Sequence, residues 1–218
     1  MAFANRRKAW AYLQDQLPTT HPVVADIVDL EAAKLNFDGI TYAKGASVLK
    51  QLVAYVGRDA FFEGARRYFR VHAFGNTTLD DLLTELSATS GRDLSSWARA
   101  WLQTAGVSTL TLEPAGRDGH EIVQTSARPH RLAVGQYDFD ESGNLVRRNR
   151  IEVDLEQRRT RVDLVDAPLT LLNDDDLTYA KVRLDTRSLT TVEDSLDRIT
   201  DPLARGLVWS ALWNATRD

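Results

Sequence analysis

The sequence predicts an α+β protein in which a helical region is followed by a β-sandwich and then by the beginning of a second helical region. Apolar residues recur at helical spacing up to about residue 104, which is the first observation. They alternate with polar residues between about 105 and 187, and helical spacing returns from 188 onwards. We therefore divide the chain into 1–104, 105–187 and 188–218.

The first part contains a helix with a clear apolar face and a clear end. Gly57 offers a stop, because glycine commonly follows the last helical residue. The face consists of residues three and four apart, namely Tyr42, Ala46, Leu49, Val53 and Val56.

Three further helices in this part have recognisable start signals. Asp59 is expected to cap the first of them, and Thr78 with Asp81 forms a capping-box pattern for the second. Asp93 is expected to cap the last one, which stops at Gly106. Their apolar faces are Phe61, Ala65, Tyr68 or Phe69, and His72; then Leu79, Leu82, Leu83 and Leu86; and then Leu94, Trp97, Ala98 and Trp101.

Alternation of apolar and polar residues predicts half-buried antiparallel strands in the second part. It is clearest around Leu110 to Leu112 and Ile151 to Leu155. Glu141–Asn144 is interpreted as a hairpin connection in which Gly143 and Asn144 supply positive φ, and Gln157–Arg159 as a second hairpin. These features predict a small antiparallel β-sandwich.

Helical spacing resumes after Ser188, and its apolar residues have no obvious partners within the sequence. A new helical layer must bury its apolar face against another element. We therefore expect this chain to be a piece of a longer protein. The apolar positions are Val192, Leu196, Ile199, Leu203, Leu207, Val208, Leu212 and Trp213.

Composition excludes several classes of protein. With 43% apolar and 27% charged residues and no run of 18 apolar residues, the chain is predicted to be globular and not to enter a membrane. The basic segment Met1–Lys8 lacks the apolar core of a secretory signal, so we expect a cytoplasmic location. The absence of cysteine excludes disulfides and thiolate-bound metals. A net charge of −4 predicts no general attraction to nucleic acid.

The segment Phe37–Lys50, FDGITYAKGASVLK, closely resembles the stretch of aminopeptidase N-type zinc peptidases that carries their catalytic tyrosine. The resemblance covers nearly the whole chain and looks most like the actinobacterial branch of that family. It continues through Asn5–Tyr12, Thr20–Pro22, Phe74–Thr78, Trp97–Gln103 and Leu171–Tyr179.

This resemblance implies a fold and an activity. It implies that 1–104 is the C-terminal helical half of a thermolysin-like catalytic domain, and that the missing N-terminal half and the rest of the C-terminal helical domain would be its partners. The parent enzyme is expected to release N-terminal residues from peptide substrates. Relatives bind zinc through an H-E-x-x-H helix and a later glutamate, and hold the substrate's α-amine with a G-x-M-E-N element. Neither element occurs here, so we expect no metal ligands in this chain and no activity from it alone.

The histidines do not replace the missing motif. His120–Gln124 imitates it, but its fifth residue is glutamine and it lies in strand-like sequence, so we interpret it as the start of a strand. His21, His72 and His130 are scattered, and no two of them have the spacing of metal ligands.

Tyr42 is the candidate catalytic residue. A phenol with a reference pKa of about 10 is a neutral hydrogen-bond donor at pH 7, suited to an oxyanion. Helical spacing by itself favours simple packing, whereas the match around Ile40–Ala46 favours catalysis. Phe37 matches a position where relatives place an aromatic ring beside the substrate's first side chain; core packing is the alternative.

Two other clusters are interpreted structurally. Arginines at 147, 148, 150, 158, 159 and 161 would form a basic strip across the second hairpin, but intervening acidic residues favour a solvated strand face. Asn173–Asp176 has the oxygen ligands of a calcium loop but lacks its glycine and final glutamate, which favours a polar turn between strands.

Two rival hypotheses remain. One is a non-catalytic protein that keeps the peptidase scaffold and uses the sandwich for partner contacts. The other is a complete small protein without peptidase ancestry, against which the segment around Tyr42 argues. An H-E-x-x-H motif upstream of Met1 would identify a fragment of an enzyme.

Overall fold

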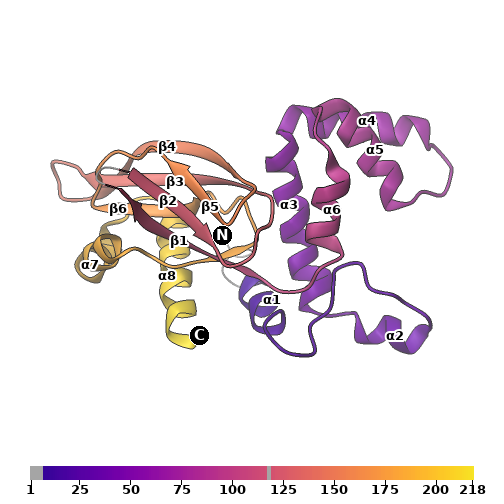
Figure 1. The fold of residues 1–218 in the computed structure, drawn as a ribbon, viewed down its shortest axis with the longest axis horizontal. Coiled ribbons are helices and arrows are strands. Elements are labelled where there is room, and N and C mark those ends of the chain that lie inside the picture. Colours follow the sequence, from indigo (N-terminus) through magenta and orange to yellow (C-terminus); the bar gives the residue numbers. More distant parts are fainter. Residues whose placement is uncertain (1–6, 117–118) are drawn as a thin grey trace.

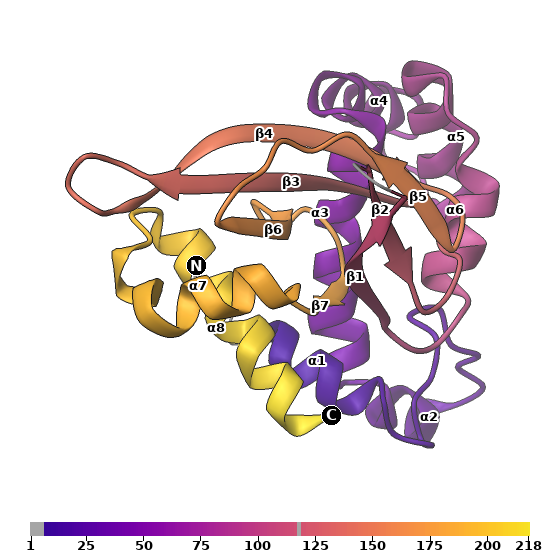
Figure 2. The ribbon, with the colours of Figure 1, turned by 60° about the vertical axis from the view of Figure 1, so that its left-hand side comes forward.

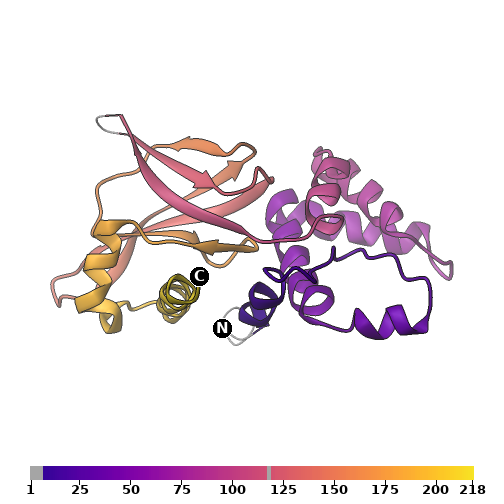
Figure 3. The ribbon, with the colours of Figure 1, turned by 60° about the horizontal axis from the view of Figure 1, so that its bottom comes forward.

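A computed structural model describes residues 7–116 and 119–218 of the chain. The helical region lies on one side of the molecule and the β-sheets lie on the other, with the helices between 186 and 217 beneath the sheets (Figures 1 to 3). The α+β class is therefore confirmed. The helical region contains α1 (Lys8–Gln14), α2 (Leu30–Leu35), the π-helical turn η2 (Ile40–Lys44), α3 (Gly45–Val56), α4 (Arg58–Val71), α5 (Leu79–Ser90) and α6 (Leu94–Leu102). The predicted helical start at Asn5 lies outside the described residues.

Most of the predicted helix ends are confirmed. Gly57 follows α3 with a φ of 87°, the Thr78 N–H donates to the Asp81 carboxylate at 2.7 Å, and Asp93 accepts the N–H of Ser95 at 2.9 Å. Two predicted features are wrong: α6 ends at Leu102 and not at Gly106, and Asp59 is not a cap. Gly57 both ends α3 and precedes α4, so Asp59 lies inside the first turn of α4.

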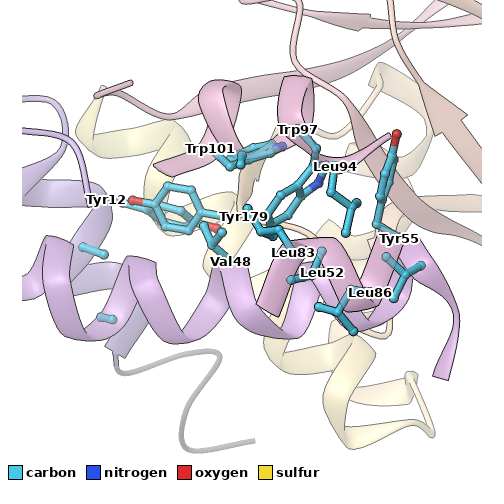
Figure 4. Close-up of a cluster of buried hydrophobic side chains, with 14 residues drawn as sticks. Tyr12, Val48, Leu52, Tyr55, Leu83, Leu86, Leu94, Trp97, Trp101 and Tyr179 are labelled. Carbon is cyan, nitrogen blue, oxygen red and sulfur yellow. The ribbon is translucent and has the colours of Figure 1, made fainter. Parts of the chain in front are cut away.

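The core of the helical region is built around α6. Its predicted inner face is confirmed, because Leu94, Trp97, Ala98 and Trp101 are all buried. They pack with Leu52 of α3 and Leu86 of α5, as the close-up in Figure 4 shows. Tyr179 reaches this cluster from the connection between β6 and β7, so a residue of the β region completes the helical core.

The β region consists of two sheets packed face to face. Its strands are β1 (Ser108–Ala115), β2 (Gly119–Gln124), β3 (His130–Phe139), β4 (Leu145–Leu155), β5 (Arg159–Val162), β6 (Leu169–Asp174) and β7 (Ala180–Val182). One sheet has the order β5-β2-β1-β7 and the other β4-β3-β6. Leu110 and Ile122 of the first sheet share a buried cluster with Leu132 and Val134 of the second.

Strand pairing corrects three details. The hairpin at Glu141–Asn144 is confirmed between β3 and β4, but positive φ occurs at Gly143 (77°) and not at Asn144. The hairpin predicted at Gln157–Arg159 is wrong, because β4 and β5 belong to different sheets and the chain crosses between them. The sandwich is also not wholly antiparallel, since β1 pairs with β7 in parallel.

The last helices pack against the sheets, so the expectation that their apolar residues lack partners within the chain is wrong for Val192, Ile199 and Val208. They are α7 (Thr186–Ser195), the short η3 (Leu196–Arg198) and α8 (Pro202–Arg217). Val192, Ala204 and Val208 form a buried cluster with Tyr137 and Leu169 of the second sheet. The domain boundaries near 104 and 187 remain a prediction. None of the helices in the described residues combines the length and the apolar character needed to cross a bilayer.

Candidate active site

Tyr42 lies in the π-helical turn η2, at the junction of the segment after α2 with α3. The turn is defined by the N–H of Gly45 donating to the carbonyl of Ile40, five residues earlier. Ile40, Ala43 and Lys44 face the core, whereas the Tyr42 side chain is 52% exposed. The sequence predicted an ordinary first helical turn here. Single π-turns within helices occur frequently at functional sites.

Asp38 holds the beginning of this turn. Its Oδ1 accepts the backbone N–H groups of Ile40 at 2.9 Å and Thr41 at 3.0 Å. Its Oδ2 lies 2.8 Å from Nε2 of His21 and also accepts the side-chain amide of Gln14. The carboxylate thus satisfies N–H groups that have no partner within the turn itself.

Helix α1 supports the same turn from the other side. The N–H of Gly39 donates to Oε1 of Gln14 at 2.9 Å. A Cβ at position 39 would lie 2.9 Å from Oε1 of Gln14 and 3.1 Å from the Trp10 ring, so a larger residue would have to push these side chains of α1 aside.

A buried ion pair anchors the end of the turn. Nζ of Lys44 lies 2.9 Å from Oδ2 of Asp15, and both side chains are fully buried. Asp15 also accepts the N–H of Gly106 at 2.7 Å and the hydroxyl of Tyr179 at 3.2 Å. Burial lowers the pKa of Lys44 against the opposing influence of Asp15, and burial together with Asp15 raises the pKa of Tyr179. The turn that carries Tyr42 is therefore tied to the β region.

Phe37 and Tyr42 lie together at the surface. Phe37 is 66% exposed, so the core-packing alternative does not describe it. The two rings stack with centroids 5.9 Å apart and an interplanar angle of 29°. The two residues singled out in the sequence thus present a phenol and an apolar ring on one accessible surface.

His21 is the residue of this site that sequence reasoning missed. It was treated as an isolated histidine, yet it contacts Asp38 and so belongs to the surroundings of Tyr42. The available signal was the Asp38-x-x-Thr41 spacing, which is typical of a side-chain cap at the start of a helix.

The other histidines have structural surroundings. His120 is the second residue of β2, in agreement with the predicted strand start. His130 is buried in β3 with Nδ1 2.7 Å from the Thr178 hydroxyl, and burial, assisted by the nearby Arg128, lowers its pKa to about 3. His72 packs against the Tyr68 ring at 5.4 Å.

The described residues do not fit a zinc centre. Within 7–116 and 119–218, no group of three His, Asp or Glu side chains is placed to hold a metal ion. His21, which contacts Asp38 at the start of the Tyr42 turn, has Nε2 2.8 Å from Oδ2 of Asp38 and Nδ1 2.8 Å from the carbonyl of Pro22. Both of its ring nitrogens are therefore occupied by protein acceptors.

The arginine and aspartate clusters form ion pairs with each other. Arg147 contacts Asp174 at 2.8 Å and Asp175 at 2.9 Å, and Arg150 contacts Asp175 at 2.6 Å. Arg159 pairs with Glu113 and Glu121 in the other sheet, so the arginines do not form a continuous basic strip. Asn173 and Asp174 end β6, and only Asp175 and Asp176 lie in the turn that was predicted for 173–176. Asp174 and Asp176 are buried.

Comparison with known proteins places the chain in a class. Residues 2–101 match the peptidase family M1 domain, and the chain belongs to this family. Within it, the resemblance to the aminopeptidase N type is confirmed. The chain is 52% identical over 241 residues to aminopeptidase N from Streptomyces lividans, an alignment that covers 99% of this chain and 28% of that protein.

Two further similarities agree with this placement. The chain is 28% identical over 209 residues to Tricorn protease-interacting factor F2 from Thermoplasma volcanium, covering 91% of this chain and 25% of that protein. The fold resembles the crystal structure of Legionella pneumophila aminopeptidase A in complex with aspartic acid, with a TM-score of 0.64 and 17% identity over 79% of this chain and 21% of that one. The chain thus spans about a quarter of the length of these relatives.

Proposed function

We propose that this chain supplies the oxyanion-binding tyrosine and a substrate-contacting aromatic residue to an M1 aminopeptidase that releases N-terminal residues from peptides. The observation that carries this proposal is the match of Phe37–Lys50 to the family, combined with the exposure of Tyr42 at 52%. A tyrosine kept for packing alone would be expected to turn toward the core, as Ile40 and Ala43 do.

The proposed role of Tyr42 is to donate a hydrogen bond. When a nucleophile adds to a peptide carbonyl, negative charge develops on the carbonyl oxygen. A neutral phenol held in advance at that position stabilises the charge without reorganising during the reaction. The contacts from Asp38 to the turn and from Lys44 to Asp15 support such preorganisation, because they fix both ends of the turn.

The proposed role of Phe37 is to contact the first side chain of the peptide. Its ring is exposed and stacks on Tyr42, so a side chain that packs against Phe37 lies close to the phenol. An aromatic ring offers a large apolar surface with little conformational freedom to lose on binding. The preferred N-terminal residue of the substrate would follow from how that side chain fits the ring.

Zinc in the parent enzyme would supply the activated water. Since the described residues do not fit a zinc centre, its ligands would have to lie elsewhere in a longer polypeptide. We propose that the chain by itself does not hydrolyse peptides. Metal analysis after dialysis and an aminoacyl reporter assay test this proposal, and tightly bound stoichiometric zinc or chelator-sensitive turnover would contradict it.

Tyr42→Phe in an active polypeptide that contains this chain is the decisive experiment. We expect kcat to fall by about 10²–10³ while KM, zinc content and melting temperature stay near wild type, because only a transition-state interaction is lost. Tyr68→Phe is the matched control, since Tyr68 lies in α4 and contacts Thr77. Wild-type turnover in Tyr42→Phe would remove the proposed catalytic role.

A partner-binding role is the second candidate. One relative is named as a factor that interacts with Tricorn protease. On this chain, Trp209 and Trp213 lie one helical turn apart on α8 and are each 59% exposed, which is a common feature of protein interfaces. A cytoplasmic location and the absence of nucleic-acid binding remain predictions.

A further inference from the structure

We propose that Asp38 is a positioning residue for catalysis, acting through Tyr42, and this inference rests on the function proposed above. Asp38 lies between Phe37 and the turn that carries Tyr42. Its side chain is only 12% exposed and contacts donors from three separate segments. No contact to substrate is required of it.

Tyr42 depends on this arrangement because its own side chain is half exposed. Because half of the side chain is exposed, few core contacts hold the ring in place. The position of the phenol therefore depends on the position of the backbone of the turn. The carbonyl of Asp38 accepts the N–H of Tyr42 at 3.1 Å, while the carboxylate accepts those of Ile40 and Thr41. Asp38 therefore accepts the backbone N–H groups of three consecutive residues and fixes the position of the backbone that carries the Tyr42 side chain.

His21 and Gln14 fix the carboxylate itself. The two partners of His21 are a carbonyl oxygen at Nδ1 and the carboxylate at Nε2, and both are acceptors. The contact of Nε2 with Oδ2 at 2.8 Å joins the carboxylate of Asp38 to the segment before α2. Gln14 links the Asp38 carboxylate to the N–H of Gly39, which connects α1 to both sides of the same peptide segment.

A double-mutant cycle tests this inference in an active polypeptide that contains this chain. Asp38→Ala should lower kcat by about 10²-fold, the cost of displacing a catalytic group by about 1 Å, with KM changed by less than about twofold. In a Tyr42→Phe background, the same substitution should cause little further loss, because the hydroxyl that it displaces is already absent. A purely structural role would lower activity equally in both backgrounds.

Asp29→Ala is the matched control. Asp29 caps α2 by accepting the N–H of Ala32 at 2.8 Å, which is the same chemistry nine residues away and outside the Tyr42 turn. Its substitution should leave kcat unchanged. If Asp38→Ala prevents folding, Asp38→Asn replaces it in the cycle, because one acceptor oxygen remains for the turn while the charge is lost.

The outcomes separate the two proposals. A large loss in Tyr42→Phe with an additive loss from the Asp38 variant overturns the positioning role and leaves the proposed function intact. Wild-type kcat in both Asp38 variants also overturns it. Wild-type kcat in Tyr42→Phe overturns the proposed function, and this inference with it. A loss in Asp38→Ala that disappears in the Tyr42→Phe background supports both.

Discussion

The helical region and the β region treat their apolar side chains differently. Leu30, Leu35 and Phe37 are between 66% and 82% exposed, and most of the exposed large apolar side chains among the described residues lie in the helical region. In the sandwich, Leu132 and Val134 are fully buried between the sheets. Contiguous exposed apolar surface is characteristic of interaction sites. The region that carries Tyr42 thus has the surface of a part that packs against something else, whereas the sandwich covers its own core.

The contact between the two regions differs in composition from the core of either region. It is formed largely by buried polar groups, with Asp15 and Lys44 on the helical side and Tyr179 from the β region. Arg128 donates to the carbonyls of Ala105 and Gly106 at the junction. Apolar contacts tolerate small displacements, whereas hydrogen-bonded ions require fixed partners. The position of the Tyr42 turn therefore depends on both regions.

The largest expected effect comes from breaking this junction. Lys44→Met leaves the Asp15 carboxylate buried without its cation, and removing one member of a buried pair typically costs about 3–5 kcal/mol. Lys34→Met in α2 is the control, since Lys34 is exposed and such changes stay within about 0.5 kcal/mol. Chemical denaturation of both variants measures the free energies of unfolding.

A second substitution sharpens the same comparison. Adding Asp15→Asn to Lys44→Met removes the uncompensated charge, so part of the lost stability should return. Hydrogen exchange should also become faster around Tyr42 in Lys44→Met, while the strand segment 151–155 stays protected. Equal acceleration in both places would mean that the two regions unfold as one unit. The helical region would then have no lower stability of its own than the β region.

Local patterns predicted much of the helical region, but the apolar face predicted for α3 is wrong. Leu49 of that face is 51% exposed, and α3 buries Val48 and Leu52 instead. The buried face of α6, the Thr78 and Asp93 caps, and the end of α3 at Gly57 all depend on residues a few positions apart. The π-turn was not predictable in the same way, because it depends on the Asp38 cap and on Gln14, which lies 24 residues earlier in the sequence.

Long-range pairing limited the prediction of the sandwich and of the site. Polar turn residues at 157–159 suit a hairpin and a crossing between sheets equally well, so the local sequence could not distinguish the two. The parallel pair of β1 with β7 joins strands about 70 residues apart, and the contact of Asp15 with Tyr179 spans 164 positions. Tyr42 and Phe37 were identified through family resemblance, and their roles remain proposals.

The next expected effect concerns acid and the β region. The pKa of His130 is lowered to about 3 by burial, so the folded protein resists protonation that the unfolded chain accepts near pH 6.5. Stability is therefore lost as the pH falls from about 6.5 toward 3, and the loss reaches about 2 kcal/mol at pH 5. His130→Asn retains a donor for Thr178 and should flatten this dependence, whereas His72→Asn in the helical region should not. A pH dependence of unfolding that is unchanged in His130→Asn would contradict the assignment.

The smallest expected effect lies at the start of α5, far from the junction. The Thr78 hydroxyl and N–H both donate to Asp81, and these hydrogen bonds lower the pKa of that carboxyl. Thr78→Ala should cost about 1 kcal/mol, the usual effect of losing a cap. A carboxyl with a lowered pKa contributes stability that is lost when the pH falls through that pKa. The difference in free energy of unfolding between Thr78→Ala and wild type should therefore shrink in acid.

Thr84→Ala in the middle of the same helix is the control, since Thr84 is exposed and alanine favours helix. It should be neutral or slightly stabilising at every pH. Comparing Thr78→Ala with Thr84→Ala tests whether the stability of α5 is independent of the contacts at the junction. If Thr78→Ala also perturbs hydrogen exchange around Tyr42, α5 is coupled to the candidate site through α6 and α3, and the division between a firmly held junction and a separately stabilised periphery is wrong.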